Sequence, residues 1–163
     1  MAAEYEGSVE QVHRAFSDEQ YWLERLADSG ADHYSLDSMT VDGEGIDIVT
    51  TQTLRADRLP GVVTQFHRGD LSFVREETWT PIRHGQATAT ITGSITGAPA
   101  TLSGTAVLAP AKSGGGSRLE VKATVQVNVP LIGGKIENFV GTQLIELLIA
   151  EQRFTTVWIT ENA

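Results

Sequence analysis

The sequence of 163 residues contains no cysteine and few basic side chains, with 12 Lys and Arg against 21 Asp and Glu. Without cysteine the protein has no disulfide framework, no thiol nucleophile and no cysteine-ligated zinc. The formal net charge is −9. Because nucleic acids and anionic membranes attract clustered Lys and Arg, this balance argues against a general affinity for either.

Targeting signals are also missing. Residues 1–7 carry two acidic side chains and no basic one, unlike a secretory leader. The most apolar stretch, residues 144–150, is interrupted by Glu146 and is far shorter than the ~20 residues of a membrane-spanning helix. We therefore expect a cytoplasmic protein without stable membrane insertion. At about 150 residues per domain, the chain is expected to form a single domain over residues 1–163.

The common motifs for metals, cofactors and catalysis do not occur. No short metal-ligand spacing such as HExxH links the histidines. The glycine-rich run at 112–117 precedes an expected strand and lacks the Lys-Ser/Thr of a phosphate-binding loop. A Gly-x-Ser-x-Gly elbow is absent too. We expect no cofactor, no metal site and no catalytic residue among the four histidines, His13, His33, His67 and His84.

Two short helices are predicted after a first strand over residues 4–7. Ser8 and Gln11 form a capping box, and apolar residues follow at helical spacing. A similar box over residues 17–20 begins a second helix, which Ser29-Gly30 ends. Trp22 and Trp158 are expected to anchor the core, and Tyr21, His33 and Tyr34 to lie near an entrance. The charged residues of these helices are expected to face solvent: Arg14, Asp18, Glu19, Glu24 and Arg25.

The middle of the chain changes to the period of two that is typical of strands. In the last three expected strands, apolar residues fall on one face and threonines and charged residues on the other, which indicates an antiparallel sheet with one covered face. The stretch 59–70 is expected to be a mobile cover. The six expected strands span residues 34–41, 46–55, 71–80, 87–95, 101–108 and 119–129.

A long helix is predicted at the C-terminus, because apolar residues keep helical spacing from Ile132 to Trp158. Its length of about 40 Å suits a helix lying across the covered face of a bent sheet.

Small residues are frequent on the expected inner face of that sheet. They either allow a close approach between helix and sheet or leave a void of a few hundred Å³ that admits a ligand. The sequence leaves both alternatives open. The small residues are Ala87, Ala89, Gly93, Gly104, Ala106 and Ala123.

Two charged residues fall on the same face of the middle strand. If Leu71, Phe73 and Trp79 point inward, alternation places Arg75 and Glu77 inward as well. An unpaired buried charge costs several kcal/mol, so both would need partners or the polar end of a ligand. Arg75 would then hold a carboxylate or phosphate, with Glu77 orienting it. The alternative is a β-bulge or a solvated rim that keeps both outside the core.

The order of these elements resembles the START-like (helix-grip, SRPBCC) superfamily, which includes lipid-transfer domains and polyketide cyclases. Residues 127–137 (VNVPLIGGKIE) and 75–79 (REETW) are similar to an uncharacterised actinobacterial branch of that superfamily. The resemblance implies an α+β helix-grip fold, in which a bent seven-stranded sheet wraps around the C-terminal helix. It also implies an apolar cavity, but no catalytic residues.

The predicted function is the binding or transport of a hydrophobic small molecule, such as a lipid, an isoprenoid or a polyketide, by a monomer or weak dimer. One alternative is a protein-interaction domain with a filled core and an acidic surface. Another is an enzyme of the cyclase or dehydratase kind, for which only Arg75 and Glu77 suggest a titratable pair. The expected ligand-binding residues are Phe73, Arg75, Glu77, Ala89, Ile91, Gly104, Ala106, Phe139, Gly141 and Leu144.

Overall fold

The computed structural model describes residues 1–59, 61–64, 68–96, 98–112, 114–128 and 133–162. Its elements are, in chain order, β1 (Ala2–Tyr5), α1 (Val9–Phe16), α2 (Glu19–Asp28), β2 (His33–Asp42), β3 (Gly45–Leu54), η1 (Ala56–Arg58), α3 (Gly61–Thr64), β4 (Leu71–Trp79), β5 (Ala87–Ile95), β6 (Ala100–Pro110), β7 (Ser117–Val127) and α4 (Gly133–Glu161).

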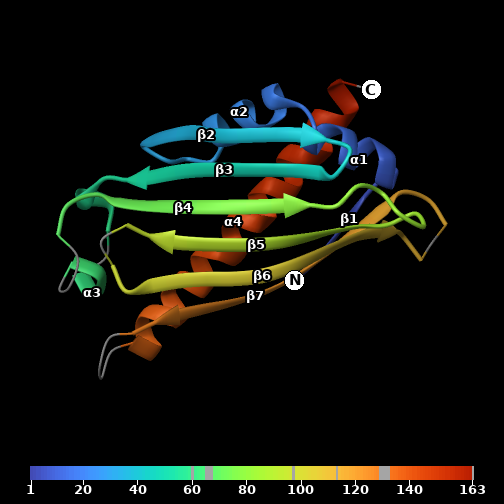
Figure 1. Cartoon of the computed structure of the whole chain (residues 1–163). Coiled ribbons are helices and arrows are strands. Elements are labelled where there is room, and N and C mark those ends of the chain that lie inside the picture. The colour runs from blue at the N-terminus through green and yellow to red at the C-terminus, as the bar shows by residue number, and fades with distance from the viewer. Residues whose placement is uncertain (60, 65–67, 97, 113, 129–132, 163) are drawn as a thin grey trace.

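The strands form one antiparallel sheet of seven strands in the order β1-β7-β6-β5-β4-β3-β2. The long helix α4 runs diagonally across one face of this sheet, and α1 and α2 lie beside its C-terminal half (Figure 1). This arrangement confirms the predicted α+β helix-grip fold. In the part of the chain that is described, no helix is long and apolar enough to cross a membrane.

The two short helices begin where polar side chains cap them. The hydroxyl of Ser8 accepts from the backbone N–H of Gln11 at 3.2 Å, and the Gln11 side chain accepts from the N–H of Ser8 at 2.8 Å, which confirms the capping box. In α2 the cap is Asp18, one residue later than predicted. Ser17 is already engaged at the end of α1, where its hydroxyl donates to the carbonyl of His13.

The strand predictions agree with the structure to within about two residues at most ends. The first strand is shifted by two residues toward the N-terminus: it occupies Ala2–Tyr5 and ends where Tyr5 pairs with Ser117. Of the predicted cover at residues 59–70, residues 60 and 65–67 lie outside the described residues, so that prediction is untested. Residues 129–132, which include the predicted end of the last strand and start of the long helix, lie outside them too.

The larger hydrophobic cluster lies between the sheet and the two short helices. Phe16, Tyr21, Trp22 and Trp79 are at its centre, with ring centroids 5.0 to 6.0 Å apart for Phe16 and its three neighbours. Trp22 is therefore a core residue as predicted, and the half-buried Trp158 packs against the same cluster.

The small residues of the inner face have more than one role. A Cβ at Gly104 would come within 2.6 Å of the Lys122 carbonyl oxygen, and one at Gly93 within 2.7 Å of the Phe73 ring, so packing within the sheet explains both glycines. Ala123, on the same face, is exposed. A Cβ at Gly141 would meet no atom within 4 Å. Space therefore remains beside Gly141 of α4 but not beside the two glycines of the sheet.

Candidate ligand-binding site

Strand β4 turns three large polar or amphipathic side chains toward the interior. Arg75, Glu77 and Trp79 are 4%, 7% and 2% exposed. The pairing of β4 with β3 runs without a shift from Leu71 to Trp79, so alternation places all three on the inner face. The alternative of a bulge or a solvated rim is therefore wrong, because the strand is regular and both charged residues are buried.

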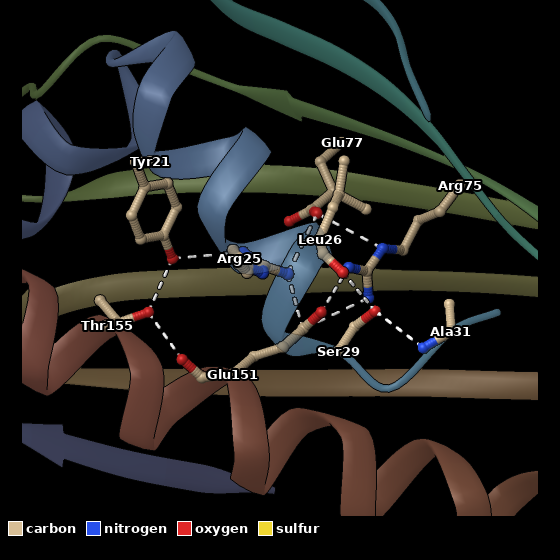
Figure 2. Close-up of polar contacts among 9 residues, drawn as sticks. All are labelled: Tyr21, Arg25, Leu26, Ser29, Ala31, Arg75, Glu77, Glu151 and Thr155. Carbon is tan, nitrogen blue, oxygen red and sulfur yellow. Dashed lines mark hydrogen bonds and ion pairs between the residues drawn. The ribbon is translucent and has the colours of Figure 1, made fainter. Parts of the chain in front are cut away.

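Two further charged side chains meet Arg75 and Glu77, one from α2 and one from α4 (Figure 2). Glu151 accepts from Arg75 Nη2 at 2.7 Å through Oε2, and its Oε1 lies 2.6 Å from Arg25 Nη2. The Glu77 carboxylate lies farther away, at 3.5 Å from Arg75 Nε and 3.7 Å from Arg25 Nη2. We call these four residues the buried quartet.

Arg25 corrects the sequence analysis, which placed it on a solvent face. It shares the buried side of α2 with Tyr21 and Trp22, and its guanidinium lies 4.6 Å from the centroid of the Trp22 ring. Tyr21 is fully buried and so does not lie at an entrance, whereas His33 and Tyr34 are exposed on β2. The position of Arg25, three and four residues after two aromatic core residues, was the signal that pointed inward.

Hydrogen bonds extend the quartet into α2 and α4. The hydroxyl of Thr155 donates to the backbone carbonyl of Glu151 at 2.7 Å, which is the one proton that this hydroxyl has to give. The Tyr21 hydroxyl, 2.6 Å away, therefore donates to Thr155, and Arg25 Nη1 donates to Tyr21 at 3.3 Å. The chain of donors runs in one direction, from Arg25 through Tyr21 and Thr155 to α4.

Three members of the quartet, Arg25, Arg75 and Glu151, are ionised. Burial raises the pKa of Glu151, but Arg25 and Arg75 together outweigh it and hold this pKa at about 2. Burial lowers the pKa of both guanidiniums, but the acidic neighbours, Glu151 first, raise it by more. Both guanidiniums therefore stay protonated. Two guanidiniums therefore share the Glu151 carboxylate, and the Glu77 side chain lies within 4 Å of both in the interior of the protein.

A cavity of about 50 Å³ adjoins the quartet, between the inner face of the sheet and α4. Its walls are mainly apolar and include Phe16, Ile91, Ala106 and Leu148, while the quartet forms its polar part. This volume is smaller than the few hundred Å³ that the small inner-face residues suggested.

Some of the predicted ligand-binding residues are brought together at this cavity. Arg75, Glu77, Ile91 and Ala106 line it. The other six lie elsewhere along the same sheet face or on α4, outside its lining: Phe73, Ala89, Gly104, Phe139, Gly141 and Leu144. The sequence analysis missed Glu151. The signal was its helical spacing from apolar residues, which places a charge on an apolar face of the helix. These apolar residues are Leu144, Leu147, Leu148, Phe154 and Trp158.

Two buried donors at this cavity have no hydrogen-bond partner: Nε of Arg75 and Nε1 of Trp79. Both residues line the cavity. Because a buried donor without a partner costs about 1–3 kcal/mol, such groups indicate a place that an acceptor can occupy.

Metal ligands do not gather anywhere among the described residues, where no group of three or more His, Asp or Glu side chains is arranged to hold an ion. His13 Nε2 donates to the carbonyl of Thr80 at 3.0 Å, and His33 and His84 are exposed. His67 lies outside the described residues.

The fold and this interior define a helix-grip domain with a charged cluster inside an apolar core. Residues 1–159 match the family described as "Protein of unknown function (DUF2505)", and the chain belongs to that family. It is 54% identical over 167 residues to Uncharacterized protein Rv0481c of Mycobacterium tuberculosis and, equally, to Uncharacterized protein Mb0491c of Mycobacterium bovis, covering 99% of this chain and 96% of each relative. These mycobacterial relatives agree with the actinobacterial branch that the resemblance pointed to.

Solved structures share the fold at low sequence identity. The protein TTHA0849 of Thermus thermophilus superimposes with a TM-score of 0.62 at 14% identity, covering 100% of this chain and 97% of that one. Ara h 8.0201, a Bet v 1 homologue, superimposes with a TM-score of 0.52 at 13% identity, covering 95% and 94%. At identities this low, the superpositions show that the fold is shared and say nothing about a ligand.

Proposed function

We propose that the protein binds a hydrophobic small molecule in the cavity between the sheet and α4. The observation that carries this proposal is the cavity itself, an apolar space of about 50 Å³ beside the quartet. Protein interiors are normally filled to crystal-like density, so a space lined by buried side chains calls for an explanation. The likeness of the fold to Bet v 1-like ligand-binding proteins supports the same proposal.

The size of the cavity limits what enters without movement. A bound water needs about 10–15 Å³ of such space, so the cavity holds a few water molecules or a small ligand fragment. A longer lipid-like chain requires the half-buried Leu148 and Gln152 of α4 to move aside. Affinity would come mainly from buried apolar surface, at about 25 cal/mol per Å².

Mass spectrometry of the native protein, paired with an organic extract of the same denatured sample, tests the proposal. We expect a bound mass that leaves on denaturation and appears in the extract. Protein that is empty, and that also fails to take up a panel of lipids and neutral apolar fluorophores, would contradict it.

The variant Ala106→Leu tests the location. Ala106 is buried and lines the cavity, so the larger side chain fills the space and lowers ligand occupancy. Val107→Leu is the matched control, because the neighbouring side chain is 37% exposed on the opposite face of β6. Equal occupancy in both variants would place the ligand elsewhere.

One feature of the surface favours a second candidate, a protein-interaction domain. Ile145 and Ile149 are one helical turn apart on the same side of α4 and are 52% and 36% exposed. Exposed apolar residues that gather on one face commonly mark contact sites. Light scattering across a concentration series, on the native chain and on Ile145→Glu, tests this candidate. An association that the substitution abolishes supports it, and a monomer at every concentration argues against self-association.

A further inference from the structure

The charges beside the cavity restrict the kind of molecule that fits it. Both guanidiniums of the quartet are already paired. The Glu151 carboxylate accepts a hydrogen bond from Arg75 Nη2 at 2.7 Å and forms an ion pair with Arg25 Nη2 at 2.6 Å. Glu77 lies within 4 Å of both guanidiniums as well. A ligand carboxylate or phosphate would add a negative charge to a set that is already balanced. Burying a charge without a counter-charge is strongly unfavourable, so an anionic head group is disfavoured here.

Two buried donors that make no hydrogen bond supply the other half of the argument. Arg75 Nε is 3.5 Å from Glu77 but makes no hydrogen bond, and Trp79 Nε1 has no partner at all among the described residues. Both side chains are more than nine-tenths buried and both line the cavity. These atoms donate and do not accept, so the complementary group on a ligand is an oxygen with lone pairs.

We propose that the cavity selects a neutral apolar molecule that bears an acceptor oxygen, such as an ester, ketone or lactone, with that oxygen bonded by Trp79 Nε1 or Arg75 Nε. This inference rests on the proposed binding function and names its ligand class. It departs from the role suggested by the sequence, in which Arg75 held a carboxylate or phosphate, because the Glu151 carboxylate already accepts from both outer nitrogens of Arg75.

The test is a nuclear magnetic resonance titration of the ¹⁵N-labelled protein with three probes of the same chain length: methyl hexanoate, hexanoate and n-hexane. The neutral ester is expected to bind at least about tenfold more tightly than the anion, because the anion brings an unbalanced charge. The indole N–H resonance of Trp79 is expected to shift downfield with the ester and not with n-hexane, which has no acceptor.

The variant Trp79→Phe isolates the hydrogen bond. We expect this substitution to weaken the affinity for the ester by about two- to tenfold, in line with the loss of one neutral hydrogen bond. The affinity for n-hexane should stay unchanged. Trp158→Phe is the matched control, since Trp158 is half-buried and does not line this cavity. Should Trp79→Phe fail to fold, the comparison of the ester with the anion on the native chain still tests the proposed ligand class.

The outcomes separate this inference from the binding function on which it rests. Hexanoate binding as tightly as the ester, or n-hexane binding as tightly as the ester, overturns the ligand class and leaves binding intact. Equal effects of Trp79→Phe and Trp158→Phe on the ester overturn the role of Trp79. If none of the three probes shifts any resonance from the cavity, the cavity binds neither kind of molecule and the proposed function falls with the inference.

Discussion

Arg75 of β4 and Glu151 of α4 are 76 positions apart in the sequence, and Arg75 Nη2 donates to Glu151 Oε2 at 2.7 Å in the interior of the protein. A second guanidinium, that of Arg25, lies at 2.6 Å from the other oxygen of the same carboxylate. Glu151 therefore joins the sheet, α2 and the long helix at one point. The helix could not shift along the sheet without separating buried charges.

Removing this shared carboxylate is expected to destabilise the protein strongly. Glu151→Gln keeps the shape of the side chain but leaves two buried guanidiniums facing one carboxylate, which typically costs about 3–5 kcal/mol. Urea denaturation followed by circular dichroism measures the change in the free energy of unfolding. The control Glu146→Gln, on an exposed position of the same helix, should stay within about 0.5 kcal/mol. A similarly small effect at Glu151 would mean that the quartet contributes little to stability.

The low pKa of Glu151 predicts a loss of stability in acid. Its pKa is about 2 in the folded protein against an ordinary value of 4.5, so the folded state holds the ionised form more strongly than the unfolded state does. The stabilisation is complete above pH 4.5 and is lost as the pH falls from there toward 2. It amounts to about 3 kcal/mol.

The measurement is the free energy of unfolding at a series of pH values between neutrality and this acid range. Glu151→Gln has no carboxyl group to titrate at this position, so its curve should fall less steeply than that of the native chain over the same window. Parallel curves for the two proteins would show that other carboxyl groups cause the acid sensitivity.

Two glycines, Gly104 of β6 and Gly141 of α4, are expected to respond in opposite ways to alanine. At Gly104 the new Cβ would approach the Lys122 carbonyl oxygen to 2.6 Å, so the neighbouring strands must move and stability falls by about 1–3 kcal/mol. At Gly141 a Cβ meets nothing within 4 Å, and alanine favours the helix by about 0.5–1 kcal/mol. Thermal unfolding of the two variants should move the midpoint in opposite directions. Destabilisation at both sites would show that the space beside Gly141 is already needed by a neighbour.

Much of the fold is predictable because its elements have clear local signals. Ser8 and Gln11 mark a helix start with two specific hydrogen bonds, and the alternation in β5 to β7 fixes which side chains share a face. The same alternation placed Arg75 and Glu77 inside. Their burial was harder to accept from sequence alone, since a charge is normally expected at the surface.

The site was only half predictable, because its other half depends on contacts between distant segments. Arg25 reads as a surface residue of a short helix until Glu151 is known to lie opposite it. Glu151 in turn is a single charge in a long apolar pattern, and its partners come from β4 and α2. Neither residue needs its charge for its own helix. Helical spacing marks each of them as a charge on a buried face, but only the fold shows that they pair with each other and with Arg75.

The hydroxyl of Tyr21 connects the quartet to α4, and its removal should disturb both neighbours. Tyr21→Phe leaves Arg25 Nη1 without this acceptor and Thr155 Oγ1 without its donor, at a cost of about 1–3 kcal/mol. Thr155→Val removes the same link from the other side. In a double-mutant cycle the two losses should not add, with a coupling of at least about 0.5 kcal/mol.

Tyr34→Phe, at a hydroxyl on the exposed edge strand β2, serves as the control and should change stability little. If the effects of Tyr21→Phe and Thr155→Val were strictly additive, the two hydroxyls would act independently and the directed chain from Arg25 to α4 would not stabilise the fold.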